Sequence, residues 1–383
     1  PMTKLEEARA KINAIDEQLV RLFLERLEVS REVAAAKREM GLPITDPARE
    51  RAILSHVAEE VGPEYENDAR LFFSTLFNIS KARQRVLLKG DSPLVRTIQA
   101  ARAATPAHFP TRAVVAVPGV EGAYAQQAAS LFFRFPTIRF VDGFERVFEA
   151  VEKGDCPYGV LPVENSAAGT VAAVYDLMCK HRFHIVRALR LKVNHVLLAV
   201  PGARLEDIKT VSSHPHAIAQ CTNFLKSHPA ISVVPGTNTA RAAKELAASG
   251  CKEAAVIASR ACAELYGLSV IAEDIGDAAF NYTRFICISK NLEIYPDANK
   301  LSLMLTLPHH PGSLNAIISK FASIDVNLSK LESRPIPGMD FEFRFTFDFD
   351  ATPTDPRVLC LLSELSLDPE IEHFVFLGAY AEN

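Results

Sequence analysis

The sequence predicts three domains of different fold class: an all-α domain, a two-lobed α/β domain and a small α+β domain. Three observations along its 383 residues predict this division. Apolar residues first recur at helical spacing, then short β-branched runs alternate with helical patterns, and finally apolar residues alternate with a period of two. A hydrophobic content of 48% with 23% charged residues fits packed cores. We expect domains at residues 1–90, 112–292 and 300–383, with a linker at 91–111.

Composition argues against several partners and compartments. A net charge of −4 disfavours nucleic acid and anionic membranes as partners. No apolar run reaches the length of a membrane span, and the charged N-terminal stretch does not resemble a secretory signal. Seven cysteines are scattered singly, which indicates reduced core residues instead of disulfides or a zinc site. We therefore expect a cytoplasmic protein without a metal.

The N-terminal domain opens with a long amphipathic helix over residues 3–40. A second helix is expected to start with Asp46 as its N-cap and Pro47 in its first turn, and a third carries "ARLFFSTLFNISKARQRVLL". The first helix would be roughly 55 Å long, too long for a lone small domain. It needs a partner along its length, so we expect an interlocked homodimer or a dimer of dimers.

Arg26 interrupts the apolar stripe of this first helix. Lys37 lies about three turns further on and projects from nearly the same face, while Ser80 and Gln84 share a face of the third helix. A charge buried on a helix seam costs on the order of several kcal/mol unless it is compensated. An anionic ligand inside the bundle would compensate it. For the other polar residues of this domain, a solvated face with local pairing and capping is the alternative.

The order R-x-K-I-x-x-I-D, E-R, A-K, D-x-x-R-E-R and S-x-x-x-Q resembles the all-helical chorismate mutases, over nearly all of the first 88 residues. The resemblance implies the pericyclic conversion of chorismate to prephenate, which needs no nucleophile, metal or other cofactor. It also implies that Arg26, and Arg9 of the other protomer, clamp the carboxylates, while Lys37 and Gln84 donate to the ether oxygen. Glu50 and Asp46 would hold the ring hydroxyl, with Arg49 and Ser80 in support. Because residue 84 is glutamine, we expect the activity to persist across neutral pH.

Polar residues of the α/β domain concentrate in four strand-to-helix turns, "PGVEGAY", "PVENSAAGT", "SSHPHAIAQC" and "GTNTARAA". The alternation of strand and helix patterns predicts a largely parallel sheet with helices on its faces. Ligands of parallel sheets bind at the carboxyl ends of strands, so these turns should meet at one cleft. The dinucleotide motif GxGxxG is absent from them, and His214 and His216 fit turn and cap positions better than a metal site. Thr283 in "NYTRFICIS" joins this cleft if its strand runs antiparallel to its neighbours. Otherwise it is a threonine favoured by β-propensity alone.

The motifs "GAYA", "PVENSAAGT", "SHPHAIAQC", "TNTARAA", "IASRACAELYGL" and "TRF" resemble prephenate dehydratases in order and spacing. The resemblance implies a two-lobed fold like that of periplasmic binding proteins, and a reaction that removes the ring hydroxyl and CO2 of prephenate to give phenylpyruvate. It assigns Thr283 as donor to the departing hydroxyl and Arg284 or turn amides as holders of a carboxylate. Phe285 would form an apolar wall of the cleft that excludes water and favours release of CO2. The cleft would be lined by Glu164, Asn165, Ser213, Gln220 and Thr239.

Two points about this cleft stay open from the sequence. Thr283 could be the acid itself or could relay a proton from Glu164. Asn238 and Arg241 stand where the family usually has serine and an acidic residue, so the role of their turn is unsettled.

The stretch "PGSLNAIISKFASIDVNLSKLESRP" resembles ACT domains, which are ferredoxin-like α+β modules. The resemblance implies an allosteric phenylalanine site made by Gly312, Ser313, Leu314, Glu332, Ser333, Arg334 and Pro335. Serine occupies position 313, where most relatives carry alanine. A purely structural dimerisation module is the alternative, because open sheet edges pair readily.

These resemblances together predict a bifunctional enzyme of phenylalanine biosynthesis with feedback inhibition by phenylalanine. The alternative from another class is a metabolite-sensing regulator without catalysis. Arogenate could also replace prephenate as the dehydratase substrate. A mutase fused to a dehydrogenase is disfavoured, because the nucleotide-binding motif is absent from the sequence.

Overall fold

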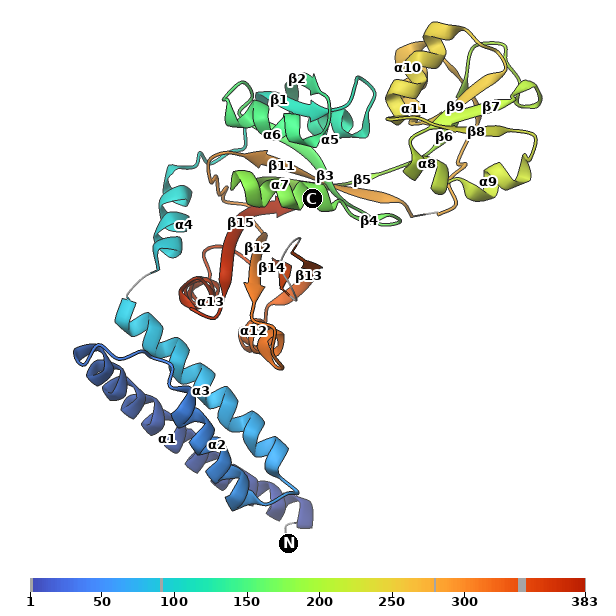
Figure 1. The fold of residues 1–383 in the computed structure, drawn as a ribbon. Helices are drawn as coiled ribbons and strands as arrows, with labels where there is room; N and C mark the ends of the chain where they lie inside the picture. The colour runs from blue at the N-terminus through green and yellow to red at the C-terminus, as the bar shows by residue number, and fades with distance from the viewer. Residues whose placement is uncertain (1–2, 90–91, 279, 337–341, 383) are drawn as a thin grey trace.

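The computed structural model describes residues 3–89, 92–278, 280–336 and 342–382. Figure 1 shows a helical unit that extends away from a two-lobed α/β body, with a C-terminal unit packed beneath one lobe. No helix within these described ranges is both long enough and apolar enough to cross a membrane.

The helical unit consists of α1 (Lys4–Glu39), α2 (Pro47–Val61) and α3 (Glu66–Lys89). Thr3 and Glu6 form a reciprocal capping box at the start of α1, which satisfies backbone N–H groups that the helix leaves free. Asp46 caps α2 by accepting from the backbone N–H of Arg49, and Pro47 occupies the first turn. The predicted long first helix and the predicted start of the second are therefore confirmed.

The apolar stripe of α1 is exposed in the single chain. Ile12, Leu19 and Leu22 expose 56%, 48% and 60% of their surfaces. A continuous apolar face of this length is typical of an interface and not of a monomer surface. The interlocked dimer stays a prediction, and this face is its expected contact surface.

The predicted linker contains the helix α4 (Pro93–Ala104). Ile98 of α4 is fully buried and joins a core with Phe347 and Leu361 of the C-terminal unit. This part of the linker is therefore an integral layer of the C-terminal unit.

Lobe 1 contains β1 (Arg112–Pro118), β2 (Phe135–Val141), β3 (Tyr158–Asn165), β4 (Gly169–Thr170), β5 (His184–Lys192) and β11 (Tyr282–Ser289), with α5 (Tyr124–Phe132), α6 (Phe144–Glu152) and α7 (Ala172–His181). Lobe 2 contains β6 (Val196–Ala199), β7 (Thr210–Ser213), β8 (Ser232–Pro235), β9 (Ala254–Ala258) and β10 (Ser269–Ala272), with the short η1 (Leu205–Asp207), α8 (Pro215–Ala219), α9 (Thr222–Ser227), α10 (Thr239–Ser249) and α11 (Arg260–Tyr266). The chain enters lobe 2 after β5 and returns through β11, and Figure 1 shows both strands reaching toward the second lobe.

The sheets are mixed and not largely parallel as the sequence suggested. Strands β1, β2 and β3 pair in parallel, whereas β11 is antiparallel to both β3 and β5. The outgoing β5 and the returning β11 lie side by side, so they must run in opposite directions. The antiparallel course of β11 pairs Thr283 with Asn165, which fulfils the condition for bringing Thr283 to the end of β3.

The C-terminal unit contains β12 (Lys300–Leu307), α12 (Ser313–Ser323), β13 (Asn327–Pro335), β14 (Phe343–Asp350), α13 (Pro356–Leu367) and β15 (Glu372–Glu382). This βαββαβ order is that of ferredoxin-like folds. The stretch "DFEFRFTFDFD" alternates with a period of two, which predicts that its phenylalanines share one face. Phe347 and Phe349 of this stretch are fully buried, and Phe341 lies outside the described residues.

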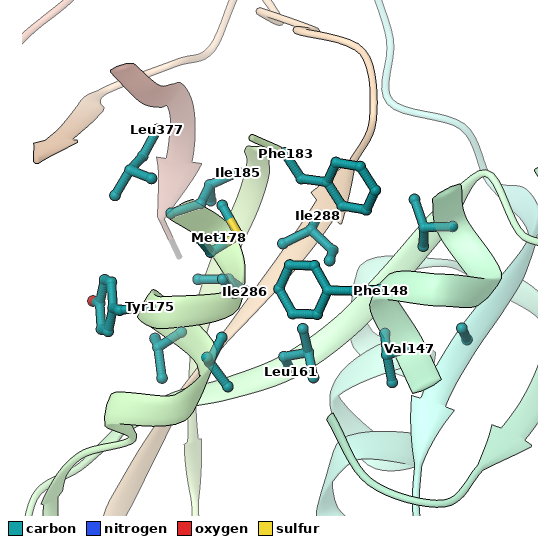
Figure 2. Packing of buried hydrophobic residues seen from close by; sticks show 14 of the residues in the cluster. Val147, Phe148, Leu161, Tyr175, Met178, Phe183, Ile185, Ile286, Ile288 and Leu377 are labelled. Carbon is teal, nitrogen blue, oxygen red and sulfur yellow. The ribbon is translucent and has the colours of Figure 1, made fainter. Parts of the chain in front are cut away.

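Lobe 1 and the C-terminal unit share a sheet and a core. The end of β15 pairs in parallel with β5, so that both units belong to one ten-stranded sheet. Figure 2 shows Leu377 of β15 beside Met178 and Ile185 of lobe 1, in the cluster that also holds Phe148 and Ile286. The two units are therefore packed as one body.

Candidate active sites

Two side-chain bridges connect α1 and α3 in the helical unit. The guanidinium Nη1 of Arg26 donates to Oγ of Ser80 at 2.7 Å, and Nε2 of Gln84 donates to Oγ of Ser30 at 2.7 Å. From the first bridge to the second, the residue number rises by four on both helices, so α1 and α3 run parallel here. Arg26, Ser80 and Gln84 were predicted to act together, and the structure brings them together. Ser30 was not predicted, although it lies one helical turn after Arg26.

Arg26 is half-buried among neutral groups. Besides its bond to Ser80, its guanidinium lies 5.7 Å from the ring centroid of Phe77. Burial lowers the pKa of Arg26, yet an arginine stays charged near neutral pH. A partly desolvated cation held by neutral partners is suited to binding an anion.

The remaining predicted residues of this unit are spread around these bridges. Nζ of Lys37 donates to the backbone oxygen of Ile44 at 2.6 Å, and Glu50 forms an ion pair with Lys81 at 3.2 Å. Asp46 is occupied in capping α2.

Arg9 and Arg49 are exposed. Arg9 lies roughly 25 Å along α1 from Arg26, so it cannot reach the same site within one chain.

A cavity of about 760 Å³ lies where the chain passes between the two lobes. It is lined by residues of both lobes and of the crossing segments, among them Ala167, Ala168, His195, Gln220, Asp277 and Asn281. A cleft of this volume fits a ring compound such as a small dicarboxylate.

Asn165 connects this cavity to Thr283. Its Nδ2 donates to Oγ1 of Thr283 at 2.9 Å and to Oδ1 of Asn281 at 2.8 Å. Nε2 of Gln220 donates to Oδ1 of Asn165 at 3.1 Å. Thr283 is 8% exposed, so its hydroxyl sits in a water-poor position, and Asn165 joins it to the cavity-lining residues Gln220 and Asn281. The predicted trio of Asn165, Gln220 and Thr283 is therefore one hydrogen-bonded group.

Sequence reasoning missed His195 and Asn281 at this cavity. Asn281 donates to Oε1 of Gln220 at 2.8 Å, and Nε2 of His195 lies 2.8 Å from the same oxygen. Asn281 stands two residues before Thr283 in the quoted motif, so the period of two along a strand could have indicated it.

The expectation that Arg284 holds a substrate carboxylate is wrong for this structure. Its guanidinium points away from the cavity and bonds Asp348 at 2.5 Å, Tyr380 at 2.8 Å and Glu382 at 3.0 Å in the C-terminal unit. Neighbouring residues of a strand face opposite sides, so Thr283 and Arg284 cannot share one site.

Two further predicted residues lie elsewhere. Phe285 is 2% exposed and packs with Val115 and Leu189 in the core of lobe 1. Ser213 is fully buried and donates to the backbone oxygen of Ile257 at 2.6 Å, a bond that connects neighbouring strands of lobe 2. Phe285 is thus a core residue instead of a cleft wall, and the hydroxyl of Ser213 has a structural partner.

The turn before α10 keeps its local function despite its departures from the family pattern. Oδ1 of Asn238 accepts from the backbone N–H groups of Ala240 and Arg241, which caps the helix as a serine would. Thr239 occupies the first helical position. The side chain of Arg241 lies 3.5 Å from Asp142 of lobe 1, at an exposed position.

Glu164 faces the C-terminal unit. Its carboxylate lies 3.3 Å from Nζ of Lys330 on β13, and Lys330 in turn lies 3.1 Å from Glu332. This places Glu164 in a charged contact between two units, one residue before the network of Asn165.

The predicted effector residues fall on two elements. Gly312, Ser313 and Leu314 open α12, while Glu332, Ser333, Arg334 and Pro335 form the end of β13. Burial would raise the pKa of Glu332, but hydrogen bonds from Thr170 and Lys330 outweigh it and lower this pKa. Arg334 pairs with Asp176 of α7 at 3.4 Å. Strand β13 is thus joined to lobe 1 by ionic contacts.

Comparison with known proteins finds two family models on this chain. The model for prephenate dehydratase matches residues 115–293, and the model for chorismate mutase type II matches residues 8–85. The two matched segments coincide with the α/β body and the helical unit.

Relatives and solved structures match a larger share of the chain than either family model does. "Arogenate dehydratase 2" of Petunia hybrida is 36% identical over 309 residues, which cover 76% of this chain and 77% of that protein. "Arogenate dehydratase/prephenate dehydratase 1, chloroplastic" of Arabidopsis thaliana is 37% identical over 286 residues, covering 70% and 71%. The crystal structure of a prephenate dehydratase from Arthrobacter aurescens in complex with L-Phe matches with a TM-score of 0.63 and 35% identity, covering 70% and 89%. The chain therefore belongs to the prephenate dehydratase family, and it is an enzyme that carries a type II chorismate mutase domain ahead of its dehydratase domain.

Proposed function

We propose that the helical unit rearranges chorismate to prephenate and that the α/β body converts prephenate to phenylpyruvate. The observation that supports the dehydratase reaction is the hydrogen bond from Asn165 to the buried hydroxyl of Thr283. In that reaction the ring C–O bond breaks, and the electron pair of the breaking bond to CO2 completes the aromatic ring. The departing oxygen takes a proton and leaves as water, so a donor such as Thr283, joined through Asn165 to the cavity lining, is the group the reaction needs.

In the helical unit, Arg26 holds a carboxylate while Lys37 and Gln84 donate to the ether oxygen as its C–O bond breaks. Donors fixed before the reaction stabilise the charge that develops on this oxygen. Arg9 of a second copy completes the site, which accords with the exposed apolar face of α1 and with the distance of Arg9 from Arg26.

Replacing Lys37 by alanine is expected to lower mutase turnover by about 10²-fold, as loss of a single oxyanion donor does. Steady-state consumption of chorismate measures this, and far-UV circular dichroism checks that the helices persist. Arg38→Ala is the matched control, because Arg38 is the adjacent, exposed cation of α1. Equal rates for wild type and Lys37→Ala would remove Lys37 from the site.

One assay tests the whole reaction sequence. Purified protein is supplied with chorismate, and the loss of chorismate and the formation of phenylpyruvate are followed together. Phenylpyruvate should accumulate without any added metal or nucleotide. Loss of chorismate without phenylpyruvate would contradict the dehydratase half.

Arogenate is the second candidate substrate, because several relatives are named arogenate dehydratases. It differs from prephenate by an amino group in place of a keto group. Comparing kcat/KM for the two compounds decides between them, and a ratio favouring arogenate would change the substrate without changing the role of Thr283.

The C-terminal unit is proposed to be an ACT domain that binds phenylalanine and inhibits the dehydratase. Its βαββαβ order supports this, as does the related structure described with L-Phe. The contact of Lys330 with Glu164 gives β13 a direct connection to the end of β3, where Asn165 lies. Inhibition requires that phenylalanine prefer one of two arrangements of this contact.

Dehydratase activity of Arg334→Ala should be insensitive to phenylalanine concentrations that inhibit the wild type. Asp176→Ala is the companion variant, since it removes the partner of Arg334 but keeps the arginine. Calorimetric binding of phenylalanine separates the two effects: Arg334→Ala should lose binding and Asp176→Ala should retain it. Unchanged inhibition of Arg334→Ala would place the effector site elsewhere.

A further inference from the structure

Two backbone groups identify which side-chain atom of Asn165 is the amide oxygen. Oδ1 of Asn165 accepts from the N–H of Ala167 at 3.0 Å and from the N–H of Ala168 at 2.9 Å. A backbone N–H can only donate, so this atom must be the amide oxygen. The amide nitrogen of Asn165 therefore faces Thr283, and the oxygen of Thr283 accepts from it.

The same logic orients Gln220 and Asn281. The end of Gln220 that lies 3.1 Å from Oδ1 of Asn165 must be its donating Nε2, so Oε1 faces the other way. That oxygen lies 2.8 Å from Nδ2 of Asn281, whose own oxygen accepts from Nδ2 of Asn165 at 2.8 Å. The three amides thus form a closed ring in which each orientation agrees with the others.

His195 must also donate to this ring. Its Nε2 lies 2.8 Å from Oε1 of Gln220, which is an acceptor, so Nε2 carries a hydrogen. Burial lowers the pKa of His195, against the opposing effect of the bond to Gln220, so a neutral ring is favoured near pH 7. His195 is 4% exposed and lines the cavity. Its Nδ1 is buried, and it has no hydrogen-bond partner within the described part of the chain.

We propose that His195 and Asn281 are positioning residues of the dehydratase, which lock the amide of Gln220 and, through Asn165, fix Thr283 as a donor. Because the oxygen of Thr283 accepts from Asn165, its hydroxyl hydrogen is left for the departing oxygen of the substrate. This inference rests on the proposed role of Thr283 as that donor.

Losing the donor of either His195 or Asn281 would weaken the hold on the amide of Gln220. If Gln220 turned its amide over, its oxygen would face Oδ1 of Asn165, and two acceptors would repel each other. Asn165 would then move from Thr283, and the hydroxyl would sample other directions. A catalytic donor misplaced in this way lowers turnover without removing the groups that bind substrate.

The test uses the full-length enzyme with prephenate as the dehydratase substrate and chorismate as an internal control substrate. His195→Phe keeps a flat ring but removes the donor, whereas His195→Gln supplies an amide N–H near the position of Nε2. Asn281→Asp keeps the shape of Asn281 but replaces its donating amide with an acceptor. His228→Phe is the matched control, because His228 also lies in lobe 2 and hydrogen-bonds a backbone oxygen, that of Phe224.

Dehydratase kcat is expected to fall about 10- to 100-fold in His195→Phe and Asn281→Asp, with a much smaller change in KM. His195→Gln should recover most of the lost kcat, and His228→Phe should behave as wild type. All four variants should keep normal mutase turnover.

Two results would overturn the inference: wild-type kcat in His195→Phe, or equal losses in His195→Phe and His195→Gln, which would indicate ring packing alone. Should His195→Phe fail to fold, wild-type kcat in Asn281→Asp would overturn it instead. The role of Thr283 is tested separately by its own variants, so a failure of this inference can be distinguished from a failure of that role.

Discussion

Thr283→Val should lose dehydratase activity by about 10³-fold while mutase turnover in the same chain stays normal. Valine has nearly the shape of threonine, so the substitution removes the hydroxyl without opening a large cavity. Asn165 keeps Asn281 as a partner for its Nδ2, so the surrounding amides retain a hydrogen bond. The loss should therefore report the missing donor and not a disrupted lobe. Phenylpyruvate formation from prephenate and loss of chorismate, measured on one preparation, separate the two activities.

Thr283→Ser is the matched control for this experiment. Serine keeps the hydroxyl and can still accept from Asn165, so a substantial part of the rate should return. Near-normal dehydratase activity in Thr283→Val would remove the threonine from the chemistry. Parallel loss of both activities would mean that the substitution acts on the whole chain instead of on one site.

Features that depend on short stretches of sequence were predicted correctly. The apolar spacing of α1, the cap at Asp46 and the buried phenylalanines of β14 each depend on a few neighbouring residues and on a fixed period. The sequence could place Thr283 in the cleft on one condition, that its strand run antiparallel to its neighbours, because this direction decides whether Thr283 meets Asn165. Such features need little knowledge of distant parts of the chain.

Features that depend on a partner from elsewhere could not be predicted in this way. The motif "TRF" holds three residues together in sequence, but the strand sends Thr283 to one face and Arg284 to the other. The face that carries Arg284 meets Asp348 and Glu382, which lie more than sixty residues later in the chain. The partner of Ser213 is likewise a backbone oxygen of a distant strand, Ile257. His195 carries no motif, and only the fold brings it to Gln220.

Arg284→Met should lower the free energy of unfolding of the body formed by lobe 1 and the C-terminal unit by about 3–5 kcal/mol. The side chains of Arg284, Asp348 and Glu382 are each less than 10% exposed. Burial alone would lower the pKa of Arg284, but Tyr380 and Asp348 outweigh it and raise this pKa. The guanidinium is therefore charged at neutral pH. Removing it leaves Asp348 buried with only hydroxyl partners such as Ser302. Urea unfolding followed by far-UV circular dichroism measures the change.

Two comparisons make this prediction specific to the buried cluster. Arg190→Met removes an arginine whose side chain is 63% exposed and which pairs with the same Glu382, so it should cost at most about 1 kcal/mol. The double variant Arg284→Met with Asp348→Leu removes both charges. Its loss in free energy of unfolding should therefore be smaller than the sum of the losses in the two single variants. Additive effects, or equal losses for Arg284→Met and Arg190→Met, would show that the buried pair does not join the units. If the pair does join them, Arg284 stabilises the contact between β11 and the C-terminal unit, one residue away from the proposed donor Thr283.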